Sequence, residues 1–157
     1  MSDITKNKQI VVNKIRALKL EGAAMTQAVA EAGADVPATA GLFAESWPEW
    51  AADGETAAAK SLWLHKGVGY QARTAIQKIE AYAPDIATNN YAVRPVPDAE
   101  GIYPAVMNMD VSIGMKLRAD DGQVYECYAN PITSLQWQPY DVPASFRLST
   151  DGTVTTV

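Results

Sequence analysis

Apolar residues near the N-terminus recur at alternating spacings of three and four, which is the pattern of one face of an α-helix. The pattern predicts a helix over residues 5–32, either continuous or broken near Gly22. Residues 33–40, which contain Pro37, are expected to end this helix as a linker. The apolar face consists of Ile4, Val11, Ile15, Leu18, Met25, Val29 and Ala32.

The same spacing fits a heptad seam, which would hold copies of the chain together. The candidate oligomer contacts are Ile4, Val11, Ile15, Leu18 and Met25. Gly22 interrupts such a seam and weakens it by about 1 kcal/mol relative to alanine. Packing of the helix on its own chain, or on a different protein, explains the pattern equally well, so these interpretations stay open.

After residue 40 the hydrophobic period falls to two and turn residues recur, which predicts mostly β structure. Three hairpins are expected, pairing residues 60–64 with 68–73, 115–119 with 123–128, and 146–150 with 153–157. Residues 94–101 contain two prolines and a glycine and separate two units. The predicted fold class is therefore α+β: an N-terminal amphipathic helix (1–40), two small antiparallel β-modules in tandem (41–97 and 98–157) and a C-terminal β-hairpin.

A shift of the chain on itself by 55 residues, without a gap, aligns these two units (122 − 67 = 55). The aligned pairs are Leu62 with Leu117, Gly67 with Gly122, Tyr70 with Tyr125, Tyr82 with Trp137, Pro84 with Pro139, Tyr91 with Phe146, and Val93 with Leu148. The identities are few, and the common pattern of hairpin turns could produce them by coincidence. They fall, however, at the turn and core positions that a small β-module needs, which favours an internal repeat.

The second unit resembles the small chitin-binding-type carbohydrate-binding modules, and most closely the copies carried by tail and baseplate proteins of bacteriophages and prophages. The residues that carry the resemblance are Gly114, Leu117, Gly122, Tyr125, Trp137, Pro139, Pro143 and Phe146. Trp47 and Trp50, separated by Pro-Glu, resemble the lead-in to such a module. The first unit departs from the pattern at Ala59, Tyr82 and Thr88, and Asn130-Pro131 stands where many phage copies carry a histidine.

The resemblance implies a non-enzymatic virion protein of a phage tail, baseplate or fibre, structural and able to present a module to host-surface glycans. Copies are then expected to associate, most simply as a trimer, with other tail proteins as further partners. The strand predicted at residues 153–157 would leave an edge that a neighbouring chain can complete. Two alternatives stay open: an assembly protein without sugar binding, and a carbohydrate-binding accessory subunit of a lytic enzyme.

Sugars bind to the faces of exposed aromatic rings, with amide and carboxyl groups at the edge. The candidates in the second unit are Tyr125, Tyr128, Trp137 and Tyr140, with Asn130, Gln136 and Gln138 as edge groups. A module this small also needs aromatics in its core. We expect the core to hold Tyr125 and Trp137, and Tyr128 and Tyr140 to be exposed.

Composition and charge exclude several other classes of protein. The net charge of −5 disfavours nucleic acid. The basic residues at positions 6–19 are either a docking arm or a solvated helix face. No apolar run reaches membrane-spanning length and no signal-peptide core precedes the helix, so we expect neither a membrane-spanning nor a classically secreted protein. The resemblance implies synthesis in the cytoplasm of a bacterial host and residence in the virion tail. With one cysteine, Cys127, and one histidine, His65, we expect no catalytic site, metal site or cofactor.

Overall fold

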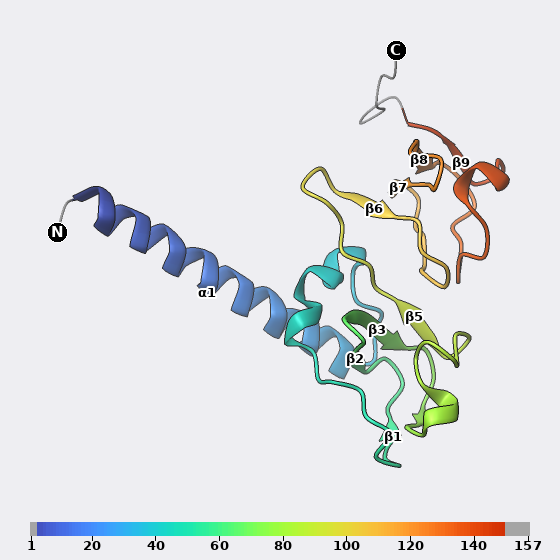
Figure 1. Cartoon of the computed structure of the whole chain (residues 1–157), viewed down its shortest axis with the longest axis horizontal. Coiled ribbons are helices and arrows are strands. Elements are labelled where there is room, and N and C mark those ends of the chain that lie inside the picture. Colours follow the sequence, from blue (N-terminus) through green and yellow to red (C-terminus); the bar gives the residue numbers. More distant parts are fainter. Residues whose placement is uncertain (1–2, 150–157) are drawn as a thin grey trace.

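A long helix projects from a body of small β-sheets in the computed structural model (Figure 1). The structure describes the backbone of residues 3–149 and the side chains of residues 13, 14 and 17–149. Helix α1 (Asp3–Glu31) precedes the sheets, which are mostly antiparallel, so the predicted α+β class is confirmed. Over the described residues, the search for a helix of sufficient length and hydropathy to cross a bilayer finds none.

Helix α1 runs through Gly22 without a break. Its C-terminal part packs on the 3₁₀-helix η1 (Ala38–Ser46), which the sequence pattern did not predict. At Gly22 the helix backbone lies against the ring of Phe43, where any side chain would collide with that ring. Gly22 therefore serves a close helix contact within the chain. The predicted heptad seam is therefore not available to other copies of the chain along the whole helix, because Gly22 contacts Phe43 of its own chain.

The first unit contains two small antiparallel sheets. One pairs β1 (Thr56–Ala57) with β4 (Ile76–Gln77), and the other orders β2 (Leu62–His65), β3 (Val68–Ala72) and β5 (Tyr91–Val93). A short 3₁₀-helix, η2 (Glu80–Tyr82), follows β4. The predicted hairpin at residues 60–73 is confirmed, except that His65 ends strand β2 instead of starting the turn.

The second unit forms a four-stranded sheet in the order β6 (Ile102–Pro104), β7 (Lys116–Arg118), β8 (Val124–Cys127) and β9 (Phe146–Leu148). The 3₁₀-helix η3 (Pro139–Asp141) precedes β9. The prediction of a purely antiparallel module is wrong here, because β6 pairs with β7 in parallel. Strand β9 pairs with β8, and the rest of the predicted C-terminal hairpin lies outside the described residues.

Strand pairing repeats from the first unit to the second. The pairs of β3 and β5 are Tyr70 with Val93, Gln71 with Ala92, and Ala72 with Tyr91. The pairs of β8 and β9 are Tyr125 with Leu148, Glu126 with Arg147, and Cys127 with Phe146. Each residue of the second set lies 55 positions after its counterpart (125 − 70 = 55 and 148 − 93 = 55). The predicted internal repeat is thus present in the fold, in the same register.

The first strand of each hairpin departs from this shift by one residue. Trp63 lies opposite Tyr70, and Leu117 lies opposite Tyr125. The counterpart of Leu117 is therefore Trp63, and the predicted alignment with Leu62 is wrong by one position.

Turn length explains this slip. The first hairpin closes through Lys66 and Gly67, both at positive φ (51° and 78°), which suits a two-residue turn. The second closes through the three residues 120–122, and the backbone N–H of Ala119 donates to the carbonyl of Gln123 at 3.0 Å. The additional turn residue moves β7 by one position relative to β8.

The slip also corrects the position of the first unit's opening residue. Lys60, not Ala59, is the counterpart of Gly114, since both have positive φ (70° and 96°). The N–H of Lys60 donates to the carbonyl of Ala72 at 2.7 Å, and that of Gly114 donates to Cys127 at 2.8 Å. The first unit therefore places a lysine in the left-handed region, where its ammonium pairs with Asp35 at 2.7 Å.

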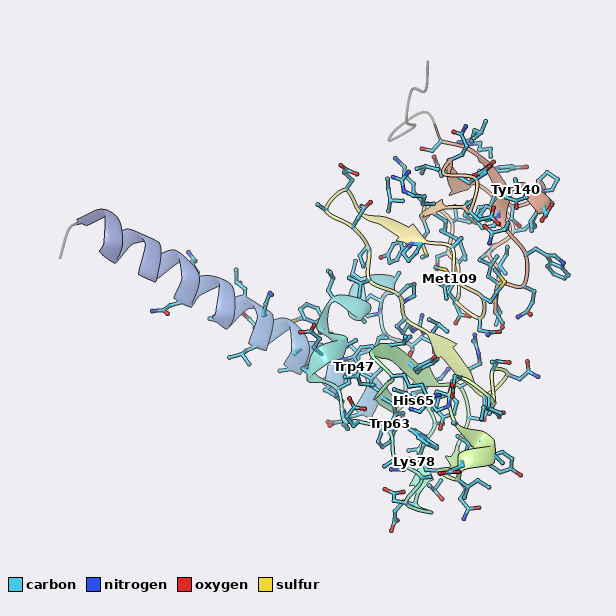
Figure 2. All side chains as sticks on the ribbon, in the orientation of Figure 1. Trp47, Trp63, His65, Lys78, Met109 and Tyr140 are labelled. Carbon is cyan, nitrogen blue, oxygen red and sulfur yellow. The ribbon has the colours of Figure 1, made fainter. Side chains whose placement is uncertain are left out.

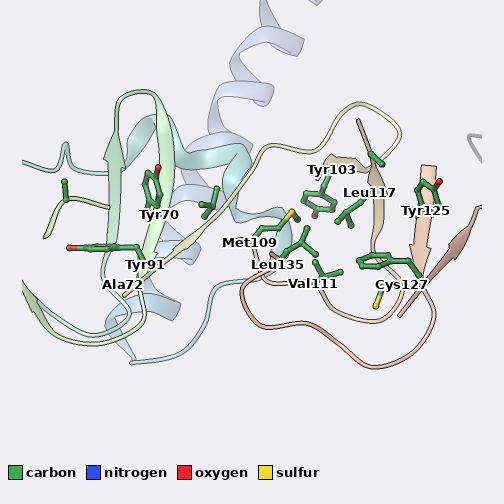
Figure 3. Close-up of a cluster of buried hydrophobic side chains, with 14 of the residues drawn as sticks. Tyr70, Ala72, Tyr91, Tyr103, Met109, Val111, Leu117, Tyr125, Cys127 and Leu135 are labelled. Atoms are coloured by element: carbon green, nitrogen blue, oxygen red, sulfur yellow. The ribbon is translucent and has the colours of Figure 1, made fainter. Parts of the chain in front are cut away.

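One buried apolar cluster extends across both units (Figure 3). Met109 and Leu135 lie between the aromatic residues of the first unit and the strands of the second. The buried aromatic members of this cluster are Trp50, Tyr70, Tyr91, Tyr103, Tyr125 and Phe146. A smaller cluster joins α1, η1 and β2 through Ala30, Val36, Ala40, Ala44, Trp47 and Leu62.

An ion pair reinforces this junction. The Arg73 guanidinium donates to both carboxylate oxygens of Asp110, at 2.7 and 3.0 Å, and the Ser134 N–H donates to Asp110 Oδ1 at 3.0 Å. Burial by itself raises the pKa of Asp110, but these hydrogen bonds and the charges of Arg73 and Arg94 outweigh burial and hold that pKa below its usual value. The pair therefore fastens β3 of the first unit to the loop before β7.

Candidate functional site

The exposed aromatic rings of the second unit lie on and beside η3. Trp137 is 64% exposed and Tyr140 is also exposed, while Pro139 between them is fully buried. The expectation that Trp137 packs in the core is wrong: the buried proline anchors the segment, and the indole ring faces solvent. Tyr125 is only 9% exposed and belongs to the core, as expected.

Hydrogen bonds join this segment to the turn of the second hairpin. The hydroxyl of Tyr140 donates to Asp120 Oδ1 at 2.8 Å, and the backbone N–H of Asp120 donates to Gln138 Oε1 at 3.0 Å. The hydroxyl of Tyr125 donates to Asp121 Oδ2 at 2.7 Å, and the Tyr125 and Tyr140 rings lie 6.3 Å apart. Hydrogen bonds to the aspartates raise the pKa of each phenol to about 12, so both tyrosines remain donors over the physiological range.

A cavity of about 380 Å³ adjoins these residues. Its polar lining groups come from Asp98, Arg118, Asp120 and Gln138, and its apolar walls include Ile102 and Ala105. Carboxylate, guanidinium and amide groups around an apolar floor match the requirements of a sugar, whose hydroxyls both donate and accept hydrogen bonds. We therefore take the cavity, together with Trp137 and Tyr140, as the candidate ligand surface.

The other predicted sugar contacts lie apart from this surface or are engaged elsewhere. The Tyr128 hydroxyl donates to the Pro143 carbonyl at 2.6 Å, and the Asn130 amide donates to the Ala144 carbonyl at 2.9 Å. Arg147 lies 5.3 Å from the centre of the Tyr128 ring. The Gln136 amide donates to Asn108 Oδ1 at 3.0 Å. The predicted set is therefore divided. Gln138 lines the cavity, Tyr140 bonds to the lining residue Asp120, and Trp137 directly precedes Gln138 in the chain.

Sequence reasoning missed Asp120, Arg118 and Asp98 as site residues. Asp120 was assigned to a hairpin turn, which is correct but incomplete, because its backbone forms the turn while its carboxylate accepts from Tyr140. Asp98 and Arg118 come from the connector and from β7. No spacing in the chain indicates that these segments meet, since the parallel β6–β7 pairing brings them together.

The predicted oligomer contacts are divided by the structure. Leu18 and Met25 are largely exposed on α1, as a seam between copies requires. Thr26 and Ala30 are buried toward the body. The side chains of the remaining three candidates, Ile4, Val11 and Ile15, lie outside the described residues.

Two observations bear on metal and thiol chemistry among residues 3–149. No group of three or more His, Cys, Asp or Glu side chains within the described part of the chain could hold a metal ion. Cys127 is fully buried in β8, and burial raises the pKa of its thiol, which keeps the thiol protonated.

A scan against protein-family models and a search of curated proteins both find no match to this chain.

Proposed function

We propose that this chain is a non-enzymatic bacteriophage virion protein of the tail, baseplate or fibre that binds a host-surface glycan through its second unit. The observation that carries the sugar-binding part is the exposed Trp137, whose chain neighbour Gln138 lines a cavity with polar groups. A soluble domain gains nothing in stability from an indole ring held in water, whereas such a ring stacks well on a pyranose face. The sequence resemblance to phage tail modules supplies the virion context.

The projecting helix supports an assembled state. Leu18 and Met25 are seven residues apart, two turns of helix, and no element in the described part of the chain covers them on α1. Apolar residues exposed on one line of a helix are covered when copies associate. We propose that α1 holds copies of the chain together, with a trimer as the expected number.

The sugar-binding proposal is tested by a glycan array that includes chitin oligosaccharides and bacterial surface glycans, with the intact chain and Trp137→Ala. We expect the intact chain to bind a glycan, and Trp137→Ala to bind it roughly 30-fold more weakly or worse, since truncating a central aromatic costs about 2 kcal/mol. If Trp137→Ala bound the glycan with full affinity, the indole ring would not be part of the binding site.

Two further variants serve as comparisons. Ile113→Ala removes another exposed apolar side chain of the second unit and should leave binding unchanged. Tyr128→Ala alters the separate Pro143–Arg147 surface and should also leave it unchanged. Loss of binding only in Tyr128→Ala would transfer the site to that surface.

The exposed line on α1 also favours a second candidate function, assembly without any sugar ligand. Mass measurement in solution of the intact chain and of Leu18→Glu/Met25→Glu distinguishes the two. A multimeric chain that becomes monomeric on substitution, combined with an array that shows no glycan, would identify a pure assembly protein.

A further inference from the structure

The first unit contains a cavity at the place that corresponds to the candidate site of the second unit. This cavity measures about 350 Å³ and is lined by Trp50, Ala51, Ala52, His65, Lys66, Glu80, Ala83, Asp85 and Ile86. Its counterpart in the second unit measures about 380 Å³. The two are thus similar in size.

Backbone hydrogen bonds establish that the two cavities are equivalent in position. The N–H of Trp50 donates to the Leu64 carbonyl at 2.8 Å, and that of Ala105 donates to the Arg118 carbonyl at 3.0 Å. These bonds align Trp50 with Ala105, and the hairpin register then aligns the residues that follow Leu64 and Arg118. Four lining positions coincide in the two cavities: Trp50 with Ala105, His65 with Ala119, Lys66 with Asp120, and Ala83 with Gln138.

A side-chain bridge to the lining residue of the turn recurs in both units with different chemistry. In the second unit the turn residue Asp120 accepts from Tyr140. In the first unit the turn residue Lys66 donates to Asp85 Oδ2 at 2.8 Å, and Asp85 is the counterpart of Tyr140 (85 + 55 = 140). An ion pair thus replaces a phenol–carboxylate hydrogen bond at equivalent positions.

An exposed aromatic residue directly precedes a cavity-lining residue in each unit. Tyr82 is 46% exposed and directly precedes Ala83 of the first cavity, as Trp137 directly precedes Gln138 of the second. Pro84 is fully buried in the first unit, as Pro139 is in the second. Both units therefore present an exposed ring on a segment that is anchored by a buried proline and that contributes the next residue to the cavity lining.

The polar groups of the first cavity fit a neutral, hydroxyl-rich ligand. His65 Nε2 lies 3.0 Å from Asp85 Oδ1, and the Trp50 ring lies edge-on to His65 with centroids 5.2 Å apart. Asp85 already forms an ion pair with Lys66. A charged ligand would therefore compete with this ion pair and would also face the carboxylate of Glu80. A sugar hydroxyl adds hydrogen bonds without displacing either partner.

We propose that the first unit is a second sugar-binding site, formed by Tyr82, His65, Lys66 and Asp85 and open to a neutral saccharide. This inference rests on the proposed glycan-binding function and extends it to two sites in one chain. Tyr140 in the β6–β9 part of the body and His65 in the β2–β5 part mark the two places (Figure 2). Two sites in one chain would raise the avidity for a polymeric glycan without any additional contact.

Calorimetric titration of the intact chain with a soluble chitin oligosaccharide, or with a short oligosaccharide of the glycan retained on the array, measures the number of sites. We expect two sites per chain. Trp137→Ala should leave one, and Tyr82→Ala and Asp85→Asn should each leave one. The combination of Trp137→Ala with Tyr82→Ala should leave none, and Ile113→Ala, the matched exposed control, should leave both.

Thermal unfolding of each variant identifies any that fail to fold, and Asp85→Asn, which keeps the shape of the side chain, then replaces Tyr82→Ala. A single site that disappears in Trp137→Ala would overturn the second site and leave the proposed function standing. Absence of binding by the intact chain would overturn both. Two sites that persist in Tyr82→Ala and in Asp85→Asn would overturn the placement in the first unit.

Discussion

The first and second β-units share the register of their paired strands, but β3 carries Gly69 where β8 carries Val124 (69 + 55 = 124). A side chain at Gly69 would lie 2.7 Å from the Ala44 methyl and 2.8 Å from the Trp47 ring. Val124 is instead fully buried and fills the equivalent space itself. The absence of a side chain in one unit is what lets η1 and Trp47 cover its sheet.

A second difference lies at the last strand of each unit. Val93 is buried and forms a parallel bridge with Met109, whereas its counterpart Leu148 is exposed. The first unit is thus covered on one side by the helical segment and on another by the second unit. When the backbone of a unit is repeated, single side chains thus determine which elements pack against each copy.

The largest test of this comparison concerns the equivalent core aromatics. Tyr91→Ala and Phe146→Ala should each lower the free energy of unfolding by about 3–5 kcal/mol, since both rings are buried in the shared cluster. Because that cluster spans both units, each variant should show one cooperative transition in urea followed by circular dichroism. Tyr82→Ala, an exposed ring, is the control and should change little. Two separate transitions would mean that the units fold independently.

The junction between the units supplies the next prediction. Asp110→Asn should cost about 3 kcal/mol at neutral pH, because Arg73 and Arg94 lose the charge that faces them. The folded-state pKa of Asp110 is lowered, so its contribution is complete above the unfolded value of about 3.9 and is lost as pH falls through the folded value. The stability difference between the variant and the intact chain should therefore shrink below about pH 4. A difference independent of pH would exclude the ion pair as its cause.

Gly69→Val transfers the residue of the second unit into the first. The substitution should destabilise the fold by about 2 kcal/mol, because the added methyl groups force Ala44 and Trp47 away from the sheet. Chemical denaturation measures the loss, and Val68→Ala at the neighbouring exposed position is the control. A neutral result would show that η1 is not held by this contact.

The smallest effects are expected at the turns. Gly67→Ala and Gly122→Ala should each cost about 1 kcal/mol, since both glycines have φ near +80°. Equal losses of stability, measured by thermal unfolding, would confirm that the glycine contributes equally to stability in a two-residue and a three-residue turn. A loss in only one unit would separate the two turns energetically.

Local patterns predicted the parts of the fold that short-range rules govern. The hairpins around Gly67 and Gly122, and the core positions of Tyr70 and Tyr125, follow from turn chemistry and a period of two. The 3₁₀-helix η1 and the parallel β6–β7 pairing did not follow, because each depends on partners distant in the chain. The one-residue slip between the hairpins was hidden by the ungapped alignment.

Site prediction failed where the environment of a side chain overrides its type. Trp137 was assigned to the core because so small a module needs aromatic residues there, but Pro139 is the buried residue of this segment. His65 was given no catalytic role, because the sequence spacing indicated no partner for it. In the structure its neighbour is Asp85, twenty residues later in the chain. Pairs that a fold brings together across a loop have no signature in one sequence.

The distribution of the four tryptophans gives the molecule a built-in optical reporter. Trp47, Trp50 and Trp63 are buried or half-buried in the first unit, whereas Trp137 of the second unit stands in water. Quenching by iodide should thus act on Trp137 alone in the native state, and the shorter-wavelength emission should come from the other three. A sugar that covers Trp137 would protect it from the quencher, so the tryptophan fluorescence of the unlabelled chain can report ligand binding.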